Sequence, residues 1–359
     1  MTDTATTGAT MDADLIVIGG GPAGCAAAVM AAGVGMRSVL VESEDALCRV
    51  LERIPVVGNV LGFSAGPALA AAIRADVADR DLCRVELGLR VVRIDAHEDR
   101  VEVTTEPAKS TGSGPLPPGP APLTAPYAVV ATGVGPLRPQ DVGWIEGGRG
   151  LEAPPLWEAD PAALAGRTVL VLGADRPLGT YLRAHPGLES RFVVACPPGD
   201  AYKAEEIADD PRVELVPVRR LTLVPPSSGA TTSPGTPVAA QAPIAAQAPV
   251  TARAPVTARA PVTAEVLTVE GDRRTLTGDR VFRNLGSGPV APGGGLFADA
   301  SGYCPPSRQH PRVFTAGDLR SARFQRIATA MGSGSEAALG AYYASRGLPT
   351  RIGAGGDDG

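Results

Sequence analysis

The sequence predicts an α/β protein with two doubly wound, three-layer domains. Residues 14–42 and residues 167–196 each show a buried strand, a glycine-containing turn, a helix and a second buried strand, in that order. Strands that alternate with helices in this way favour parallel sheets that are covered on both faces. Apolar strand patterns return at residues 280–286 and 312–318, and the pattern after them predicts a final helix over 325–345.

The first repeat opens with DLIVIGGGPAG at residues 14–24, a continuous apolar strand that runs into a glycine turn. The Ala-rich segment after it predicts a helix, and SVLVE at residues 38–42 predicts a second buried strand. The elements that follow are a helix at 66–80 and strands at 85–96, 101–106 and 127–133, with a Pro/Gly-rich interruption at 107–126.

The second repeat has the same form. Its predicted elements are a strand at 168–173, a turn at 174–179, a helix at 180–185 and a strand at 191–196, followed by strands at 213–224 and 265–271. Two units of this kind in one chain predict two nucleotide-type domains.

A Pro-rich segment at residues 225–264 separates two strand patterns of the second domain. It contains four copies of a six-residue unit: QAPIAA, QAPVTA, RAPVTA and RAPVTA. A proline in every copy excludes a regular helix and favours extended conformations, so we expect a disordered insertion on a surface hairpin. An expanded repeat without a role is favoured over a binding motif, because no aromatic residue punctuates it.

Composition and charge exclude several classes of function. The net charge is −5 and no Lys/Arg cluster occurs, so the electrostatic footprint of a nucleic-acid-binding protein is missing. No stretch of about 18 apolar residues occurs, and the polar start from Met1 to Met11 lacks the pattern of an export signal. We therefore expect neither a nucleic-acid partner nor a membrane span.

The cysteines and histidines predict no metal site. Five cysteines, of which the closest two are 23 residues apart in the sequence, fit neither a disulfide framework nor a close-spaced zinc motif. This usage predicts a reducing, cytoplasmic compartment. The three histidines, His97, His185 and His310, are scattered and form no catalytic dyad or metal-ligand set in the sequence.

The glycine turn of the first repeat has the spacing of a Rossmann-like dinucleotide site. Gly19 permits a tight turn, Gly21 lets the backbone approach a pyrophosphate, and Gly24 allows close packing of the helix. Glu42 lies at the end of the next strand, where a carboxylate takes the hydroxyl groups of a ribose. The motif predicts an adenine dinucleotide and does not separate FAD from NAD.

Four segments together resemble the low-molecular-weight thioredoxin reductases. They are IVIGGGPAG, PVVGNVLGFSAGPALAAAI, VVATG and VFTAGDLRSARFQRIATAMGSGSEAA, and they span most of the chain outside the insertion and the tails. The resemblance implies that the cofactor is FAD. It places Gly317 and Asp318 over the ribityl chain and phosphates, and it places Gln325, Arg326 and Ile327 under the isoalloxazine, where a helix N-terminus suits the electron-rich edge of a flavin.

The resemblance and the motif together give a set of residues expected to bind FAD. These residues are Gly19, Gly21, Pro22, Ala23, Gly24, Glu42, Asn59, Val92, Ala131, Thr132, Gly133, Gly317, Asp318, Gln325, Arg326 and Ile327.

The resemblance also implies a discontinuous FAD domain and a homodimer. The expected parts are an FAD-binding domain at residues 12–138 and 280–348, a degenerate NAD(P)H-binding-like domain at 139–279 with its insertion at 225–264, and loose tails at 1–11 and 349–359.

Two elements expected from the resemblance are altered in this sequence. The segment that carries the redox Cys-x-x-Cys in the family has Pro154 to Trp157 here, and no cysteine spacing offers a substitute; Cys25 is interpreted as a small packed thiol. In the second turn Asp175 replaces the middle glycine, and its charge opposes a pyrophosphate. The sequence therefore speaks against NADPH as the donor, while Arg176 and Arg191 leave weak NAD(H) binding open.

We therefore expect an FAD-dependent oxidoreductase that lacks the redox dithiol and moves electrons directly through its flavin. The alternative is a noncatalytic FAD-binding protein that senses, regulates or contacts a protein partner. The donor, the acceptor and the substrate cannot be read from the sequence.

Overall fold

The computed structural model describes residues 11–108, 121–147, 153–224 and 261–349. The chain divides into two compact units, of which unit 1 comprises residues 1–136 and 287–359 and unit 2 comprises residues 137–286. The sequence analysis set the corresponding boundaries at residues 138 and 280. Each unit has its own sheet, parallel in unit 1 and mixed in unit 2, and the predicted α/β class is confirmed.

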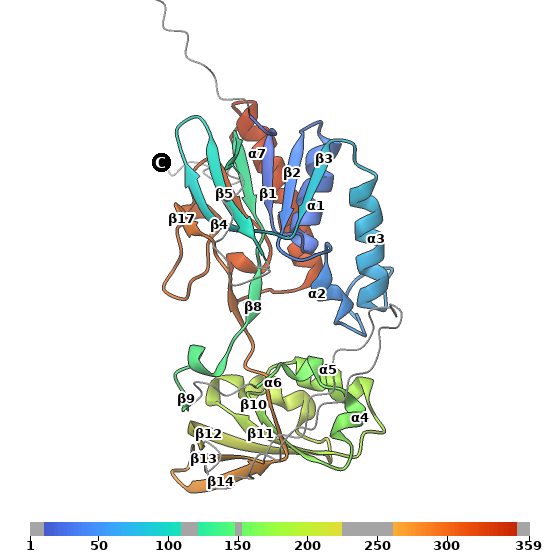
Figure 1. Cartoon of the computed structure of the whole chain (residues 1–359), viewed down its shortest axis with the longest axis vertical. Helices are drawn as coiled ribbons and strands as arrows, with labels where there is room; N and C mark the ends of the chain where they lie inside the picture. The colour runs from blue at the N-terminus through green and yellow to red at the C-terminus, as the bar shows by residue number, and fades with distance from the viewer. Residues whose placement is uncertain (1–10, 109–120, 148–152, 225–260, 350–359) are drawn as a thin grey trace, which may run out of the picture. The chain divides into compact units, whose positions relative to one another are not determined.

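Unit 1 is built on a five-stranded parallel sheet in the order β18-β7-β1-β2-β3, of which Figure 1 labels β1, β2 and β3. Its strands are β1 (Leu15–Ile18), β2 (Ser38–Glu42), β3 (Cys83–Leu87), β7 (Tyr127–Val130) and β18 (Val313–Thr315). Because every pair is parallel, the carboxyl ends of all five strands lie at one edge of the sheet.

Successive side chains of these strands point to opposite faces of the sheet, so each face packs against a different layer. Leu15 and Val17 face helices α1 (Pro22–Gly33), α3 (Gly66–Ala78) and α7 (Ile327–Ser345). Ile16 and Ile18 face the other way, toward a four-stranded sheet. That sheet has the order β17-β4-β5-β6 and consists of β4 (Leu89–Ala96), β5 (Val101–Pro107), β6 (Leu123–Ala125) and β17 (Gly293–Gly294). Unit 1 therefore has three layers, of which the third is made of strands.

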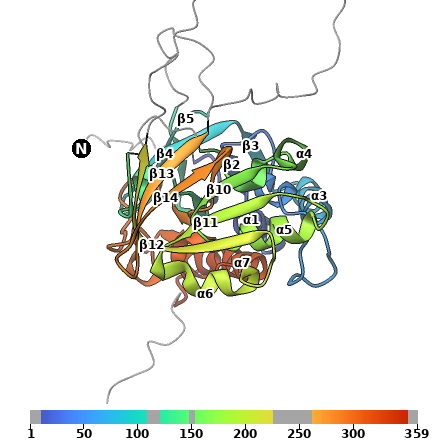
Figure 2. The ribbon, with the colours of Figure 1, turned by 90° about the horizontal axis from the view of Figure 1, so that it is seen from below.

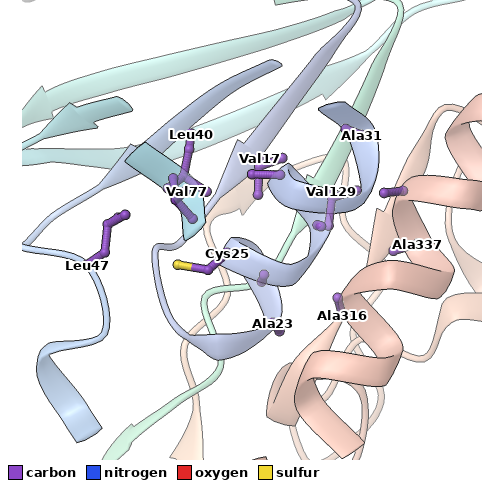
Figure 3. Close-up of a cluster of buried hydrophobic side chains, with 14 of the residues drawn as sticks. Val17, Ala23, Cys25, Ala31, Leu40, Leu47, Val77, Val129, Ala316 and Ala337 are labelled. Atoms are coloured by element: carbon purple, nitrogen blue, oxygen red, sulfur yellow. The ribbon is translucent and has the colours of Figure 1, made fainter. Parts of the chain in front are cut away.

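Helices α1 and α7 cross at short range, although they come from opposite ends of the chain. A Cβ atom at Gly334 would overlap the carbonyl group of Ala23, so only glycine allows this approach. Small buried side chains continue the contact, and Figure 3 shows Ala23, Ala316 and Ala337 gathered on this side of α1. The C-terminal helix α7 therefore packs directly against the first turn of α1, which follows the first glycine turn.

Unit 2 has a sheet in the order β14-β13-β12-β11-β10-β15, with β9 (Ile145–Glu146) paired to β12. Strands β10 (Thr168–Leu172), β11 (Arg191–Cys196), the first half of β12 (Val213–Val224) and β15 (Arg280–Arg283) are parallel, and Figure 2 shows β10, β11 and β12 side by side. Strands β13 (Val262–Thr268) and β14 (Arg273–Gly278) add an antiparallel extension.

The two faces of the unit 2 sheet are also covered by different structures. Val169 and Phe192 pack with α5 (Pro177–Ala184) and α4 (Pro161–Leu164). Leu170 and Val193 pack with residues of β9, β13 and β14. The layers of unit 2 thus repeat those of unit 1, with helices on one face and strands on the other.

Several predicted element boundaries differ from the structure; for example, α5 begins at Pro177, within the turn expected at 174–179. Three of the differences change how strands are assigned. The strand expected over 85–96 is broken at Gly88, whose φ of 72° turns the chain from β3 into β4 of the second sheet. Strand β6 lies inside the stretch interpreted as an interruption at 107–126. Residues 262–264, placed in the insertion by the sequence, belong to β13, where Ala264 is buried opposite Leu223 of β12. The remainder of the insertion, residues 225–260, lies outside the described residues.

Within the described ranges, the helices are all too short or too polar to cross a bilayer.

Candidate functional site

The first glycine turn joins β1 to α1 at the carboxyl edge of the unit 1 sheet. Gly19 has a φ of 99°, and a Cβ atom there would lie 2.5 Å from the carbonyl oxygen of Ala131. A Cβ atom at Gly24 would overlap the carbonyl oxygen of Gly19. At Gly21, by contrast, a Cβ atom would meet no atom within 4 Å. Gly19 and Gly24 are therefore required by the fold itself, whereas Gly21 leaves open space over the turn.

The N-terminus of α1 faces this open space without a side-chain cap. Gly21 is the N-cap residue, Pro22 follows it, and the first turn contains no acidic residue. The first N–H groups of a helix have no partner inside the helix, and the helix dipole places positive potential there. The turn therefore has the properties of an anion site, and a dinucleotide pyrophosphate fits it.

Glu42 closes one side of the turn. Its Oε2 accepts a hydrogen bond from the backbone N–H of Gly20 at 2.5 Å, and its Oε1 accepts from the N–H of Glu44 at 2.8 Å and from the hydroxyl of Ser43 at 3.0 Å. A carboxylate has about four acceptor positions, so one position on Oε2 stays available. Glu42 thus supports the turn and can still accept one ribose hydroxyl.

The ends of β7 and β18 bring further predicted residues to the same edge. Ala131 donates its N–H to Ile18 of β1 at 2.7 Å. Thr132 donates its hydroxyl to the carbonyl of Val290 at 2.5 Å, and Val290 donates its N–H to the carbonyl of Gly133 at 3.1 Å. These contacts fix the 131–133 turn beside Gly19.

Gly317 lies close to the start of α1. Its N–H donates to the hydroxyl of Ser333 in α7 at 2.8 Å, and a Cβ atom on Gly317 would come within 2.9 Å of the Cβ of Ala23. The residues after β18 therefore lie beside the first turn of α1.

Asp318 follows Gly317 in a 3₁₀ turn. Within the described residues, its side chain forms no hydrogen bond with α7. Its carboxylate is half-buried and has no hydrogen bond or ion pair within the described part of the chain, and burial raises its pKa to about 6. Asp318 is therefore not a cap of α7, whose N-cap residue is Arg326. A partly buried carboxyl group that has no hydrogen-bond partner in the protein is suited to bind a polar group of a ligand.

Gln325, Arg326 and Ile327 form the entrance to α7. Gln325 donates its side-chain amide to the carbonyl oxygens of Ser321 at 3.0 Å and Asp318 at 3.4 Å. Arg326 is the N-cap residue, and the helix begins at Ile327. The Gln325 amide thus joins this entrance to the Asp318 turn.

Asn59 and Val92 stand apart from the other predicted residues. Asn59 is exposed in the loop before α3, and Val92 lies at the bulge of β4, where its carbonyl oxygen would be 3.2 Å from a Cβ on Gly293. Neither forms a hydrogen bond with the glycine turn in the ranges that the structure describes.

The second glycine turn repeats the backbone of the first. Gly173 has a φ of 90°, and a Cβ atom there would lie 2.5 Å from the carbonyl oxygen of Asn284. Asp175 stands where Gly21 stands in unit 1. Asn284 fixes it by accepting the Asp175 N–H at 3.1 Å and donating its side-chain amide to the Asp175 carbonyl at 2.6 Å.

Lys203 holds the carboxylate of Asp175. Its Nζ lies 2.9 Å from an oxygen of Asp175 and 3.0 Å from an oxygen of Asp200, and all three side chains are about four-fifths buried. Burial lowers the pKa of Lys203, but the hydrogen bonds and charges of the two aspartates outweigh burial and raise it overall. The three groups carry a net charge of −1 at the edge where a parallel sheet binds a dinucleotide, and this charge opposes the approach of a pyrophosphate.

The structure changes the interpretation of Arg191. This residue begins β11 at the amino end of the strand, and its guanidinium pairs with Glu214 at 2.5 Å. It cannot serve a nucleotide at the carboxyl edge. Lys203, which the sequence analysis missed, is the cation that lies beside the second turn, whereas Arg176 is exposed at the start of α5.

The segment from Pro154 to Trp157, where the resemblance places the redox cysteines of the family, packs within unit 2. Pro155 precedes a 3₁₀ turn at Leu156–Glu158, in which Leu156 is fully buried and Trp157 is half-buried. No thiol is present in this segment. The described residues also contain no group of three His, Cys, Asp or Glu side chains placed to hold a metal ion.

One known protein family matches the first part of this chain. Residues 13–174 match the family described as pyridine nucleotide-disulphide oxidoreductase. No curated protein matches the chain.

Several solved structures share the fold across nearly the whole chain. Thioredoxin reductase from Lactococcus lactis has a TM-score of 0.68 and 17% identity, covering 94% of this chain and 100% of its own. Thioredoxin reductase from T. acidophilum has a TM-score of 0.65 and 19% identity, covering 93% and 99%. Bacillithiol disulfide reductase from Bacillus cereus has a TM-score of 0.63 and 19% identity, also covering 93% and 99%. Residues 13–174 therefore match the pyridine nucleotide-disulphide oxidoreductase family, and the chain has the fold of the thioredoxin reductases.

Proposed function

We propose that this protein is an FAD-binding oxidoreductase of the thioredoxin reductase type that moves electrons directly through its flavin. The observation that carries the proposal is the open turn at Gly21, which has an uncapped helix N-terminus on one side and an acceptor position of Glu42 on the other. These features address the ADP half of a dinucleotide, which FAD has and FMN lacks.

The residues of this chain have distinct roles in the proposal. The N-terminus of α1 at Gly21 and Pro22 holds the pyrophosphate, and Glu42 orients the adenosine ribose. The 131–133 turn and Gly317 shape the site beside the turn, and Asp318 offers a carboxyl group to the polar chain of the cofactor. When bound, FAD supplies one- and two-electron redox chemistry.

The absence of the family dithiol defines the reaction class. The sequence contains no Cys-x-x-Cys, and Pro155 and Leu156 occupy a packed segment in the region where the resemblance places it. A relay through that segment needs two thiols, one that attacks the substrate disulfide and one that exchanges electrons with the flavin. We therefore propose direct exchange between the flavin and an acceptor, with a donor other than NADPH.

A second candidate is a noncatalytic flavoprotein with a sensing, regulatory or protein-binding role. The ion-pair triad of Asp175, Lys203 and Asp200 favours it, because a unit that excludes pyridine nucleotides leaves the flavin without the usual donor of the family. Turnover separates the two candidates: a sensor binds FAD but sustains no reaction with any donor and acceptor.

The test begins with the cofactor. The purified protein is expected to be yellow, and mass spectrometry of the released cofactor is expected to find FAD. Release of FMN, or no affinity for added FAD, contradicts the proposal.

A second experiment tests the electron donor. The flavin is reduced under anaerobic conditions with NADH and with NADPH, and the reduction is followed at the flavin absorption band. Rapid and saturable reduction by NADPH would show that the second unit works as in the family.

A homodimer and a cytoplasmic location are further proposals drawn from the resemblance and from the cysteine usage. Sedimentation of the purified protein tests the first, and fractionation of cells tests the second.

A further inference from the structure

Two cysteines that are distant in the sequence meet behind the first glycine turn. The Sγ atoms of Cys25 and Cys48 are 3.8 Å apart, and both side chains are buried. Cys25 lies in the first turns of α1, and Cys48 immediately precedes α2 (Arg49–Glu52). Figure 3 shows the sulfur of Cys25 directed toward the side of Leu47, away from Ala337 of α7. The pair therefore bridges α1 and the segment that follows β2.

Both cysteines are anchored to the same backbone group. The carbonyl oxygen of Gly20 accepts the N–H of Cys48 at 2.8 Å and the thiol of Cys25 at 3.3 Å. A Cβ atom on Gly20 would come within 2.5 Å of the Leu47 side chain. The two thiols are thus held on one side of the turn, and their approach is a product of the fold.

The backbone at Cys48 is unusual. Its φ of 55° lies in the left-handed region, which only one other non-glycine residue, Phe324, adopts in the described part of the chain. Left-handed conformations at non-glycine residues require support from the surrounding structure and collect at functional sites. This conformation directs the Cys48 side chain into the same cluster as Cys25.

We propose that Cys25 and Cys48 form a redox-active dithiol, oxidised to an intramolecular disulfide by small-molecule disulfides. In the reaction, one thiol loses its proton and attacks a sulfur of the oxidant RSSR, and the expelled RS⁻ takes up that proton to give RSH. The second thiol loses its proton and attacks the mixed disulfide, which releases a second RSH in the same way. Two thiols lose two electrons and two protons, and the oxidant gains both. The sulfur atoms must approach from 3.8 Å to about 2 Å, the length of a disulfide bond.

Burial sets the rate of this reaction rather than its outcome. The pKa of Cys25 is raised, first by its hydrogen bond with Cys48 and then by burial, so the thiolate is scarce at neutral pH. Oxidation therefore proceeds through opening of the segment after β2. That segment is suited to opening, because α2 has only four residues and Leu61, in the loop that follows it, is 98% exposed.

The proposed disulfide would act on the cofactor turn. It ties the start of α1 to the segment after Glu42, so the two sides of the ADP-binding turn separate less readily. Slower release of FAD from the oxidised protein follows from this, and this consequence alone rests on the proposed function.

Thiol counting on the full-length protein tests the pair. The protein is incubated with oxidised glutathione, separated from all glutathione, denatured, and titrated with an aromatic disulfide reagent. Wild type is expected to fall from five free thiols to three, and the matched control Cys83→Ser from four to two. Cys25→Ser can lose only the thiol of Cys48, as a mixed disulfide with glutathione, and is expected to keep at least three of its four thiols. A wild type that keeps five thiols, or a Cys25→Ser protein that still loses two, overturns the proposal.

Peptide mapping gives an answer that does not depend on any variant folding. Trypsin cuts after Arg37 and Arg49, so Cys25 falls in the peptide 1–37 and Cys48 in the peptide 38–49. The oxidised wild type is expected to yield these two peptides cross-linked, two mass units lighter than their sum and separable by a reductant. Glutathione attached to either peptide without the cross-link contradicts the proposal. FAD release is measured separately, so failure of flavin binding is distinguished from failure of the dithiol.

Discussion

The two glycine turns of this protein share a backbone and differ in what they leave open. Gly19 and Gly173 have φ values of 99° and 90°, and a Cβ on either would lie 2.5 Å from a carbonyl oxygen of the neighbouring strand connection. At the middle position Gly21 faces open space, whereas Asp175 carries a carboxylate paired with Lys203. The first glycine is thus required for the tight connection between the strand and the helix. The middle glycine is required only where a bound ligand needs the space over the turn. A turn that keeps its folding glycine therefore says little about binding.

The largest effect is expected when the first turn is given the side chain of the second. Gly21→Asp places a negative charge where the pyrophosphate is proposed to lie, at a φ of −73° that any residue adopts. Repulsion of about 1 to 4 kcal/mol per phosphate charge corresponds to a roughly 5- to 1000-fold loss of FAD affinity. Fluorescence titration of the apoprotein with FAD measures it. Gly21→Asn is the control for size, and equal losses in both variants would show that charge is not the cause.

The converse change is expected to give the second turn a new ligand. Asp175→Gly removes one carboxylate and leaves Lys203 with Asp200 alone, so NADPH affinity is expected to rise by roughly tenfold, the value of about 1.4 kcal/mol of removed repulsion. Calorimetric titration with NADPH measures the change. Glu214→Gln is the matched control, because its ion pair with Arg191 lies at the opposite end of the strands. Tight NADPH binding by the wild type would contradict the comparison at once.

A smaller effect is expected at Glu42. Glu42→Gln keeps the shape of the side chain but removes the charge that strengthens its hydrogen bonds with Gly20 and Glu44. The substitution also removes the charge from the proposed hydrogen bond with the ribose hydroxyl; a charge-assisted hydrogen bond exceeds a neutral one by about 1 kcal/mol, so FAD affinity is expected to fall roughly fivefold. The same titration measures it, and an unchanged affinity would mean that Glu42 supports only the turn.

The smallest effect concerns the pH dependence of Asp318. Its pKa is raised to about 6 in the folded protein, so the folded state holds the proton more tightly than the unfolded chain. The stability that this group contributes is therefore fully present below about pH 4, the usual pKa of the unfolded carboxyl, and is lost as the pH rises through 6. Asp318→Asn is expected to flatten the melting temperature of the apoprotein between pH 4 and 7. A wild-type profile that the substitution leaves unchanged would contradict the assignment.

The fold was predictable because the sequence repeats a strand, a glycine turn and a helix twice at recognisable spacing. Gly19, Gly24 and Glu42 followed from that pattern, since each position answers a local constraint. The position of Arg191 was also readable: a residue that begins a parallel strand lies at the amino end, opposite the helix N-terminus.

Two features had no signal in the sequence. Lys203 comes 28 residues after Asp175 and reaches it only because β11 and the short helix α6 (Ala201–Ala204) bring the chain back to the turn. Cys25 and Cys48 are 23 residues apart, and no spacing rule joins them; parallel pairing of β1 with β2 and the shared contact with Gly20 bring the sulfur atoms together. Contacts of this kind depend on tertiary structure, which pattern alone does not supply.

The crossing of α1 and α7 has a consequence for biosynthesis. Strand β18 and helix α7 come from residues 313–345, so they leave the ribosome only after all of unit 2 has been made. Until then β7 is an edge strand with unpaired backbone groups, and the alanine-rich surface of α1 lacks the helix that covers it. Unit 2 is one continuous stretch of chain and can fold first during synthesis. A nascent chain that stalls before residue 313 therefore exposes the unpaired edge of β7, which can pair with other chains. We expect such stalled chains to depend most strongly on chaperones.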